Sequence, residues 1–245
     1  MNYDSALNNQ VDNILELHRQ GQTAQALSEI NLLIKNFPSD EVLINIRGGL
    51  FASLGNVSSA IEDYNKSILI NPNYSKAYYN LGLALHDQEK LEEAKTNYIL
   101  SLKLDSNNAE AHNNLGNVYR DLKDYNSAMH SFQDAIKIKP KYIEAHYSLG
   151  LTFQDLNKLN QSIDSYKKVI SLKPNFAGMH NNLGNVQKEL GHIDDALKSY
   201  ERAIYYNSNF AEAYYNAGLI YQDLNNFDNA INKYTKAINL KPDYQ

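Results

Sequence analysis

The sequence predicts an all-α protein, a right-handed superhelical solenoid of seven helical hairpins that are each 34 residues long. Three columns recur at that step: one holds all five prolines, one holds glycines and one holds mostly alanines. The columns are Pro38, Pro72, Pro140, Pro174 and Pro242, with Ser106 and Ser208 between them; Gly48, Gly82, Gly116, Gly150, Gly184 and Gly218; and Ala26, Ala60, Ala94, Ala128, Ser162, Ala196 and Ala230. A fixed period of this kind indicates a stack of one repeated unit, in which each unit buries its apolar face against its neighbours.

The period divides almost the whole chain into seven units, which we expect to form a single array over residues 1–245. The units are 7–40, 41–74, 75–108, 109–142, 143–176, 177–210 and 211–244. The first unit is degenerate, because Ile14 stands in the glycine column and Asn13 takes the place of the leucine before it. An atypical outer unit is expected to serve as an N-terminal cap.

The last unit shows why each unit is predicted to be a helical hairpin. Apolar residues at helical spacing predict a first helix around 214–221 and a second helix around 227–238. Asn225 and Asn226 separate the two, because asparagine favours helix ends and turns. Pro242 ends the second helix, since its ring cannot continue one. The glycine and alanine columns are the positions where the two helices are expected to approach closely.

The order of residues within a unit resembles that of a known repeat family. It runs aromatic-x-x-Leu-Gly-x-x-Tyr, then alanine, an aromatic residue, alanine and proline. This pattern resembles the tetratricopeptide repeat. The resemblance implies that the first helices of the hairpins line a concave groove and that the protein binds other proteins there.

Composition argues against several other classes of protein. The net charge is −5 without a long run of lysine or arginine, which disfavours binding to a nucleic-acid backbone. The absence of cysteine excludes disulfides and thiolate metal sites, and no apolar run of about 18 residues is present to insert into a membrane. The N-terminal segment is polar and acidic, unlike a signal peptide, so we expect a cytoplasmic protein.

Catalytic motifs are also missing. The sequence contains no Walker loop, G-x-G-x-x-G, G-x-S-x-G or H-E-x-x-H. His112, His146 and His180 recur every 34 residues, but this column is expected to pack between helices, so no metal is predicted. We therefore expect no enzymatic activity and no cofactor in this chain, although it could be the non-catalytic part of a larger enzyme.

An amide column supplies the first candidate binding residues. Asn80, Asn114, Asn182 and Asn216 each lie two residues before a glycine of the column, and Ser148 interrupts the series. A carboxamide has both donors and an acceptor, so it can hold a peptide backbone without reading its side chains. The competing interpretation is that these asparagines only link adjacent first helices.

A second period of two units, 68 residues, modifies the same face. The units that begin at residues 109 and 177 share the sequence HNNLGNV. Asn117 and Asn185 therefore stand where other units have Leu83, Leu151 and Leu219. We expect the ligand face to alternate between units, and we count the two asparagines among the candidate binding residues.

Acidic residues form two columns on the first helices. One lies near the helix starts, where the helix dipole favours acids and where they would face the groove. It consists of Glu110, Glu144 and Glu212. The other lies late in the helices, where an acid opposes the dipole, so a structural partner between units is expected. It consists of Asp87, Asp121, Asp155, Glu189 and Asp223.

The tyrosines divide into packing residues and candidate binding residues. Tyr98, Tyr166, Tyr200 and Tyr234 are among those that fall on packing columns, so we expect them in the core. Tyr79, Tyr147 and Tyr215 precede the amide column by one residue and are expected to be exposed. They would offer apolar contact with a polar tip.

The run AEAHNNLGNVYRDLKDYNSAMHSFQDAIKIKP resembles the superhelical repeats of O-linked N-acetylglucosamine transferases. In that family an asparagine ladder holds the backbone of extended substrate proteins, and acidic groove residues tune their choice. The resemblance implies these roles for the amide column and for Glu110, Glu144 and Glu212. Ser148 breaks the match, and the sequence contains no glycosyltransferase domain.

Other tetratricopeptide domains bind the C-terminal carboxylate of heat-shock chaperones through lysine and arginine on consecutive first helices, alongside asparagine. Asn117 or Asn185 matches the asparagine of that pattern. Asn113 and Asn181, however, stand where lysine is needed. The resemblance to this group therefore lacks its cationic part.

The sequence thus predicts a protein–protein interaction scaffold that binds an extended peptide or protein segment in a concave groove through the amide column. Its acids favour neutral-to-basic segments. Two alternatives stay open: the substrate-recruitment region of a larger glycosyltransferase, and a self-assembling scaffold. The open face of the last unit is rich in tyrosine and isoleucine, so we expect this unit to pack on another molecule or on more of a longer chain.

Overall fold

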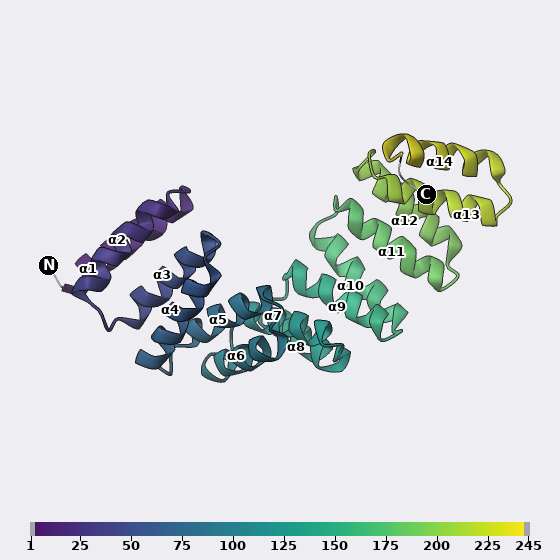
Figure 1. Cartoon of the computed structure of the whole chain (residues 1–245). Coiled ribbons are helices and arrows are strands. Elements are labelled where there is room, and N and C mark those ends of the chain that lie inside the picture. The colour runs from purple at the N-terminus through teal and green to yellow at the C-terminus, as the bar shows by residue number, and fades with distance from the viewer. Residues whose placement is uncertain (1–2, 243–245) are drawn as a thin grey trace. The chain divides into compact units, whose positions relative to one another are not determined.

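The computed structural model describes residues 3–242, with side chains from Leu7 onward. These residues form fourteen α-helices and no strand, and the two helices of each repeat pair as an antiparallel hairpin (Figure 1). This confirms the predicted all-α fold of repeated hairpins. Each expected unit holds one odd-numbered first helix and one even-numbered second helix, except that the first helix of the first unit begins before residue 7.

The helices have regular bounds, because the first helices from the second unit onward span 13 residues and the second helices 14. They are α1 (Tyr3–Arg19), α2 (Thr23–Asn36), α3 (Glu41–Ser53), α4 (Val57–Ile70), α5 (Ser75–Asp87), α6 (Leu91–Leu104), α7 (Ala109–Asp121), α8 (Tyr125–Ile138), α9 (Ile143–Asp155), α10 (Leu159–Leu172), α11 (Ala177–Glu189), α12 (Ile193–Tyr206), α13 (Ala211–Asp223) and α14 (Phe227–Leu240).

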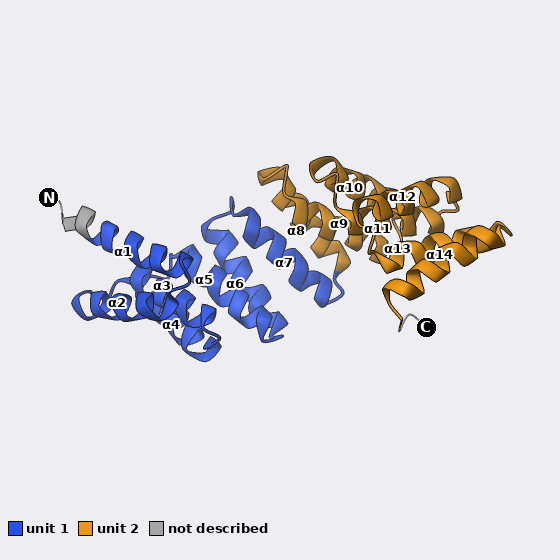
Figure 2. Cartoon of the chain, turned by 90° about the horizontal axis from the view of Figure 1, so that it is seen from above, with its two compact units in different colours: residues 1–124 blue, residues 125–245 orange. Residues whose placement is uncertain are grey.

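The chain divides into two compact units, residues 1–124 with α1 to α7 and residues 125–245 with α8 to α14 (Figure 2). In the first compact unit α5 contacts both α3 and α7, and in the second α11 contacts α13. The first helices α3, α5 and α7 therefore lie beside one another, and so do α11 and α13. The single continuous array over all seven repeats stays a prediction.

A left-handed residue ends the first helix of every hairpin. Backbone φ is positive once per repeat, always at the same place in the turn, and the residues are Gly21, Gly55, Glu89, Lys123, Asn157, Gly191 and Asn225. Such a residue lets the chain reverse at once and satisfies the last carbonyls of the helix. Asn225 N–H, for example, donates to the carbonyl oxygen of Gln222 at 2.9 Å. The predicted turn at Asn225 is therefore confirmed.

At five of the six positions of the glycine column a tyrosine ring lies against the glycine; the five are Gly48, Gly82, Gly150, Gly184 and Gly218. A Cβ atom on Gly184 would lie 2.5 Å from Cε1 of Tyr200, and one on Gly82 would lie 2.9 Å from the ring of Tyr98. Such distances are far inside van der Waals contact, so a side chain there would push the two helices apart. The close approach predicted at this column is thus real, and the opposing group is the tyrosine of the second helix.

The N-terminal hairpin fills the same space with different residues. Ile14 replaces the glycine and Ile30 the tyrosine, and both are fully buried in the core between α1, α2 and α3. Arg47 on α3 adds a bidentate ion pair with the buried Asp63 on α4 at 2.6 and 2.7 Å, and it also donates to Asn31 on α2. The carboxylate of Asp63 raises the pKa of Arg47 further above its ordinary value. This polar link ties the degenerate unit to the next one.

Candidate peptide-binding face

All candidate residues lie on odd-numbered helices, and we call the surface that they form within each compact unit its first-helix face. It comprises Tyr79 and Asn80 on α5; Glu110, Asn114 and Asn117 on α7; Glu144 and Tyr147 on α9; Asn182 and Asn185 on α11; and Glu212, Tyr215 and Asn216 on α13. The asparagines of this set are half-buried, and the three glutamates are exposed. The face is therefore polar and accessible in part.

In the first compact unit each amide of the column bonds to the preceding first helix. Asn80 Nδ2 donates to Asn45 Oδ1 at 3.0 Å, and Asn114 Nδ2 donates to the hydroxyl of Tyr79 at 3.2 Å. Asn114 Oδ1 also accepts a long bond from Asn113 at 3.4 Å. These bonds link α5 to α3 and α7 to α5.

In the second compact unit the bonds join into a network between α11 and α13. Asn216 Nδ2 donates to Asn181 Oδ1 at 3.0 Å and to Asn185 Oδ1 at 3.2 Å. Asn181 in turn donates to Glu212 Oε1 at 2.8 Å. The hydroxyl of Tyr200 donates to Asn185 Oδ1 at 2.9 Å, which connects the network to the second helix α12.

These bonds support in part the interpretation that the column asparagines serve to link adjacent first helices, because three of the four do so. They also leave hydrogen-bonding capacity, since a carboxamide has two N–H groups and an oxygen with two lone pairs. Asn80 and Asn216 use only their nitrogens in these bonds. Among the described residues, Asn182 takes part in no such bond. The structure therefore orients the column without exhausting it.

The glutamates place negative charge beside the tyrosines and amides. Burial is the main cause that raises the pKa of Tyr79, and the carboxylate of Glu110 adds to it, while the bond from Asn114 opposes the shift. Burial together with Glu212 raises the pKa of Tyr200 to about 12. Glu110 and Glu212 lie in the first turns of α7 and α13, where the helix dipole stabilises acids.

The three candidate tyrosines pack on tyrosines of the second helices. Ring centroids are 6.0 Å apart for Tyr79 and Tyr98, 6.3 Å for Tyr147 and Tyr166, and 5.7 Å for Tyr215 and Tyr234. Tyr215 is exposed at 37%, whereas Tyr79 and Tyr147 are half-buried. Of the three tyrosines that were expected to be exposed, only Tyr215 is. The packing tyrosines Tyr98, Tyr166 and Tyr200 are buried as predicted, whereas Tyr234, expected in the core as well, is only half-buried because no further hairpin among the described residues covers α14.

Sequence reasoning missed the amides that receive the column. Asn45 and Asn181 are buried at 6% and 1%, and each accepts from the column asparagine of the following unit. Their position alternates along the chain between asparagine and tyrosine: Asn45, Tyr79, Asn113, Tyr147, Asn181, Tyr215. The 68-residue period was the signal that could have found them.

Asp121 of the late acidic column and the recurring histidines have structural partners. Asp121 Oδ2 lies 2.8 Å from His86 Nε2 on the preceding first helix, which is the kind of inter-unit partner expected for this column. His146 and His180 use Nε2 to contact the carbonyl oxygens of Pro140 and Pro174, at 3.0 and 2.8 Å. Each ring therefore holds the loop before its own helix.

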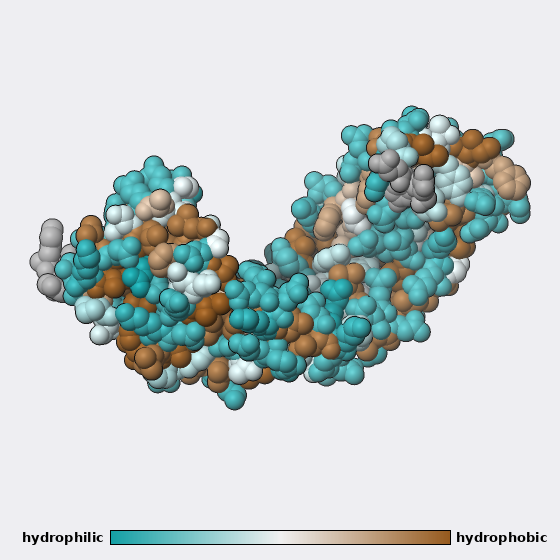
Figure 3. Space-filling model, in the orientation of Figure 1, coloured by the Kyte–Doolittle hydropathy of each residue, from teal (hydrophilic) through white to brown (hydrophobic). Residues whose placement is uncertain are grey.

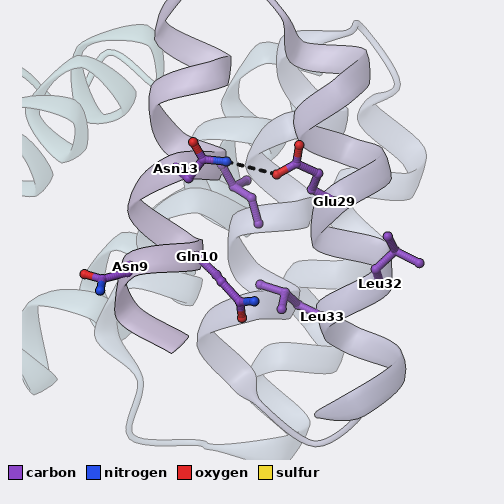
Figure 4. Close-up of a pocket in the computed structure, with 7 residues that line it drawn as sticks. Asn9, Gln10, Asn13, Glu29, Leu32 and Leu33 are labelled. Carbon is purple, nitrogen blue, oxygen red and sulfur yellow. Dashed lines mark hydrogen bonds between the residues drawn. The ribbon is translucent and has the colours of Figure 1, made fainter. Parts of the chain in front are cut away.

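Metal sites and membrane spans are absent from the described part of the chain. Residues 3–242 contain no group of three or more histidine, cysteine, aspartate or glutamate side chains that could hold a metal ion. Within the same range no helix is long and apolar enough to cross a membrane. A pocket of 430 Å³ lies between α1 and α2, lined by Asn9, Asn13, Glu29 and Leu32 among others, and it contains none of the candidate residues (Figure 4).

Repeated helical hairpins with a polar face along their first helices define this chain as a helical repeat protein. Models of the TPR repeat match residues 48–89, 83–119, 116–157, 153–191 and 188–225, and a model of the tetratricopeptide repeat matches residues 211–244. The chain belongs to the tetratricopeptide repeat family.

Named relatives share parts of the chain. The Hsp70-Hsp90 organising protein of Plasmodium falciparum is 35% identical over 81 residues, which are 33% of this chain and 32% of that protein. Heat shock protein STI1 of Saccharomyces cerevisiae is 33% identical over 91 residues, 34% of this chain and 15% of that protein. This chain thus spans a third or less of these curated relatives.

Solved structures share the fold over more of the chain. The crystal structure of YrrB, described as a TPR protein with an unusual peptide-binding site, has a TM-score of 0.65 at 27% identity and covers 75% of this chain and 95% of that one. The C-terminal part of a TPR repeat-containing protein from Cytophaga hutchinsonii has a TM-score of 0.81 and covers 96% of both chains, at 16% identity. The second likeness concerns the fold alone.

Proposed function

We propose that this protein is an interaction scaffold that binds an extended protein segment along its first-helix face. The observation that carries the proposal is the amide column, in which three of the four carboxamides are held in place by neighbouring first helices and still have hydrogen-bonding capacity to spare. YrrB, a solved relative, is described by its peptide-binding site, and the curated relative is named for Hsp70 and Hsp90. Both names support protein binding as the general role.

Pre-oriented carboxamides suit the backbone of an extended peptide. Each bond to a neighbour fixes the side-chain rotamer before binding, so less rotamer entropy is lost when a ligand arrives. A net gain of about 1 kcal/mol per hydrogen bond over four positions amounts to about 4 kcal/mol, which on its own corresponds only to millimolar affinity, so apolar contacts on the same face must supply the rest. The column would thus give affinity without strong selection of side chains.

The charges on the face favour a neutral or basic segment. Glu110, Glu144 and Glu212 are exposed, and the candidate positions include no lysine or arginine. The likeness to the Hsp70-Hsp90 organising protein does not bring a carboxylate site with it, because Asn113 and Asn181 are buried at 6% and 1% where cations would be required. An acidic C-terminus is therefore a poor ligand for this face.

Asn182→Ala is the cleanest test, because this side chain makes no hydrogen bond within the described residues. A peptide-display selection on the wild type would supply the ligand, and its affinity would be measured by calorimetry. We expect Asn182→Ala to weaken binding about fivefold while the thermal transition stays unchanged. Asn160→Ala, at an exposed position on α10, is the matched control. Equal affinity of Asn182→Ala and wild type for every selected peptide would remove the amide column from the proposal.

A second candidate function is self-association through the C-terminal hairpin. Phe227, Ile231 and Ile238 on α14 are exposed at 58%, 63% and 50%, whereas Ile193 and Leu197, the counterparts of the first two on α12, pack against the core shared with α13. Figure 3 shows hydrophobic residues at the surface over α14, among polar ones. A patch of this kind on a repeat protein marks a contact surface.

The opposite end of the chain differs from an internal unit. Ala213, Ala217 and Ile220 on α13 are fully buried, but Asn9, Asn13 and Glu16 stand at the same repeat positions on α1 and are exposed. Figure 4 shows Asn13 bonded to Glu29 on this surface. The polar α1 surface is thus a poor match for α14, and contact between two C-terminal hairpins fits better.

Sedimentation equilibrium over a range of concentrations tests this candidate. We expect the average mass of the wild type to rise with concentration, and the variant Ile231→Asp with Ile238→Asp to stay monomeric. Leu69→Asp, on a residue of α4 that is 82% exposed and so even more accessible, should behave as the wild type. A wild type that is monomeric throughout the range would exclude self-association. The recruitment role within a larger glycosyltransferase and a cytoplasmic location stay predictions.

A further inference from the structure

We infer that the ligand of the first-helix face carries two apolar side chains about six residues apart, with polar residues between them. The inference rests on the proposed binding function and specifies its ligand. It comes from the second compact unit, where the three first helices α9, α11 and α13 do not present the same side chains. The hydrogen bonds of the tyrosine hydroxyls on the second helices differ in the same alternating way.

The alternation involves two positions four residues apart, which lie on one face of a helix. The outer helices α9 and α13 carry tyrosine and then leucine there: Tyr147 and Leu151, and Tyr215 and Leu219. The middle helix α11 carries asparagine at both, Asn181 and Asn185. An apolar stripe, an amide stripe and a second apolar stripe therefore follow one another across the unit.

The second helices are adapted to this alternation. Behind the amide stripe, the hydroxyl of Tyr200 donates to Asn185 Oδ1 at 2.9 Å. In the apolar stripes a leucine occupies the position of Asn185 and offers no acceptor. The hydroxyls of Tyr166 and Tyr234 donate instead to Gln154 and Gln222, near the ends of α9 and α13. The leucines therefore have no polar group to satisfy, and they remain available for apolar contact.

The tyrosines of the apolar stripes are held in place and partly accessible. Tyr147 packs on Tyr166 and Tyr215 on Tyr234, with ring centroids 6.3 and 5.7 Å apart. Tyr147 and Leu151 are half-buried, and Tyr215 is 37% exposed. A rigid aromatic ring next to a leucine gives an apolar side chain a surface to cover at low entropic cost.

Helix spacing sets the distance between the two apolar stripes. The repeat places α9 one step before α11, as α11 stands one step before α13, so a helix spacing of about 8–10 Å would put α9 and α13 roughly 16–20 Å apart. An extended peptide advances about 3.3 Å per residue, which makes this about five or six residues. Side chains alternate between the faces of an extended chain, so an even number is required for both to point to the protein. A separation of six residues satisfies both conditions, and it places the intervening backbone over the half-buried Asn182 and Asn185 of α11, since Asn181 is 1% exposed.

Peptides of designed spacing test the inference on the full-length chain. The probes are fluorescent, capped peptides of alternating serine and threonine that carry one leucine at position i and a second at position i+4, i+5, i+6, i+7 or i+8. Their binding is measured by fluorescence anisotropy. We expect the tightest binding at six, about fivefold tighter than at five or seven, because odd separations turn one leucine away.

Two variants identify the source of the preference. Leu151→Asn with Leu219→Asn installs the residue that α11 already carries at this position, and it should abolish the preference for six. Tyr205→Asn, on α12 at a side chain 82% exposed, is the control and should keep it. Circular dichroism would establish that both variants fold.

Three results would overturn the inference. They are equal affinity at all separations, a preference that survives the double leucine variant, and failure of every designed peptide to bind. None of these bears on the amide column itself, which the Asn182→Ala test with selected peptides judges separately. The spacing rule and the peptide-binding function can therefore fail independently.

Discussion

The hairpins α5–α6 and α11–α12 share one packing arrangement and differ in one hydrogen bond. In both, a buried tyrosine ring lies against a glycine of the first helix, Tyr98 against Gly82 and Tyr200 against Gly184. The hydroxyl of Tyr200 donates to Asn185. The hydroxyl of Tyr98 is buried and has no hydrogen-bond partner among the described residues.

The difference comes from the first-helix face. Leu83 stands at the position of Asn185, so it offers no acceptor. His86, at the position where α9 and α13 have glutamine, is engaged with Asp121 at 2.8 Å. The ring position is thus set by the fold, while the bonding of the hydroxyl is set by residues on the candidate binding face. Core and face are coupled through the tyrosine hydroxyl.

The largest expected effect tests the shared packing. Gly184→Ala should lower the free energy of unfolding by about 2 kcal/mol, because its Cβ would overlap the ring of Tyr200, and Gly82→Ala should cost less because the contact is longer. Gly49→Ala is the control, since its Cβ would lie 3.9 Å from Tyr64; it should gain about 0.5 kcal/mol from helix propensity. Urea denaturation would measure all three, and a neutral Gly184→Ala would contradict the packing argument.

Removal of the two hydroxyls should have opposite effects. Tyr200→Phe loses a hydrogen bond and leaves Asn185 with one fewer donor, which should cost about 1 kcal/mol of stability. Tyr98→Phe removes a buried hydroxyl that has no partner among the described residues, so it should be neutral or stabilise by about 1 kcal/mol. The comparison of the two hairpins would be wrong if both changes destabilised the protein equally in urea denaturation.

Alkaline pH should weaken the α11–α12 hairpin through Tyr200. Its pKa is raised to about 12, while an unfolded tyrosine has a pKa of about 10. The folded state keeps the proton longer, so this contribution is complete below pH 10 and is lost as the pH rises through about 12. At about pH 11 the wild type should have lost about 1 kcal/mol more than Tyr200→Phe does, relative to about pH 8. Equal losses in the two proteins would show that Tyr200 does not carry the effect.

The smallest expected effect is the repair of the α5–α6 hairpin. Leu83→Asn would give the hydroxyl of Tyr98 the acceptor that Asn185 gives Tyr200. Because the substitution also removes apolar packing, we predict the coupling energy rather than the net change. A double-mutant cycle that combines Leu83→Asn with Tyr98→Phe should give a favourable coupling of about 0.5–1 kcal/mol between the introduced carboxamide and the tyrosine hydroxyl. Zero coupling would mean that the two groups do not meet.

Much of the fold follows from the sequence, because proline and glycine have strict local requirements. The proline column falls after the second helices, as its ring demands, and the glycine column falls where a tyrosine leaves no room for a Cβ. The left-handed turn column escaped notice at most positions, because Glu89 and Lys123 occupy it as well as glycine and asparagine. A turn that is held by its flanking helices does not need a diagnostic residue.

The candidate face followed from the sequence only as a set of columns. Periodicity places Asn80, Asn114, Asn182 and Asn216 on one side of the first helices, and all four lie half-buried on those helices. Periodicity gives no distances between helices, so it did not show that three of these amides bond to a neighbouring helix while Asn182 does not. Whether they bind a ligand stays a prediction.

The sequence by itself determined the repeat, the helical hairpins and the residues that line the first helices, since each depends on local conformation and on one fixed period. Only the tertiary structure decided which polar groups are paired, which tyrosine hydroxyl lacks a partner among the described residues and which face of α14 is uncovered. These properties depend on distances between side chains from different helices, and such distances arise only when the hairpins pack.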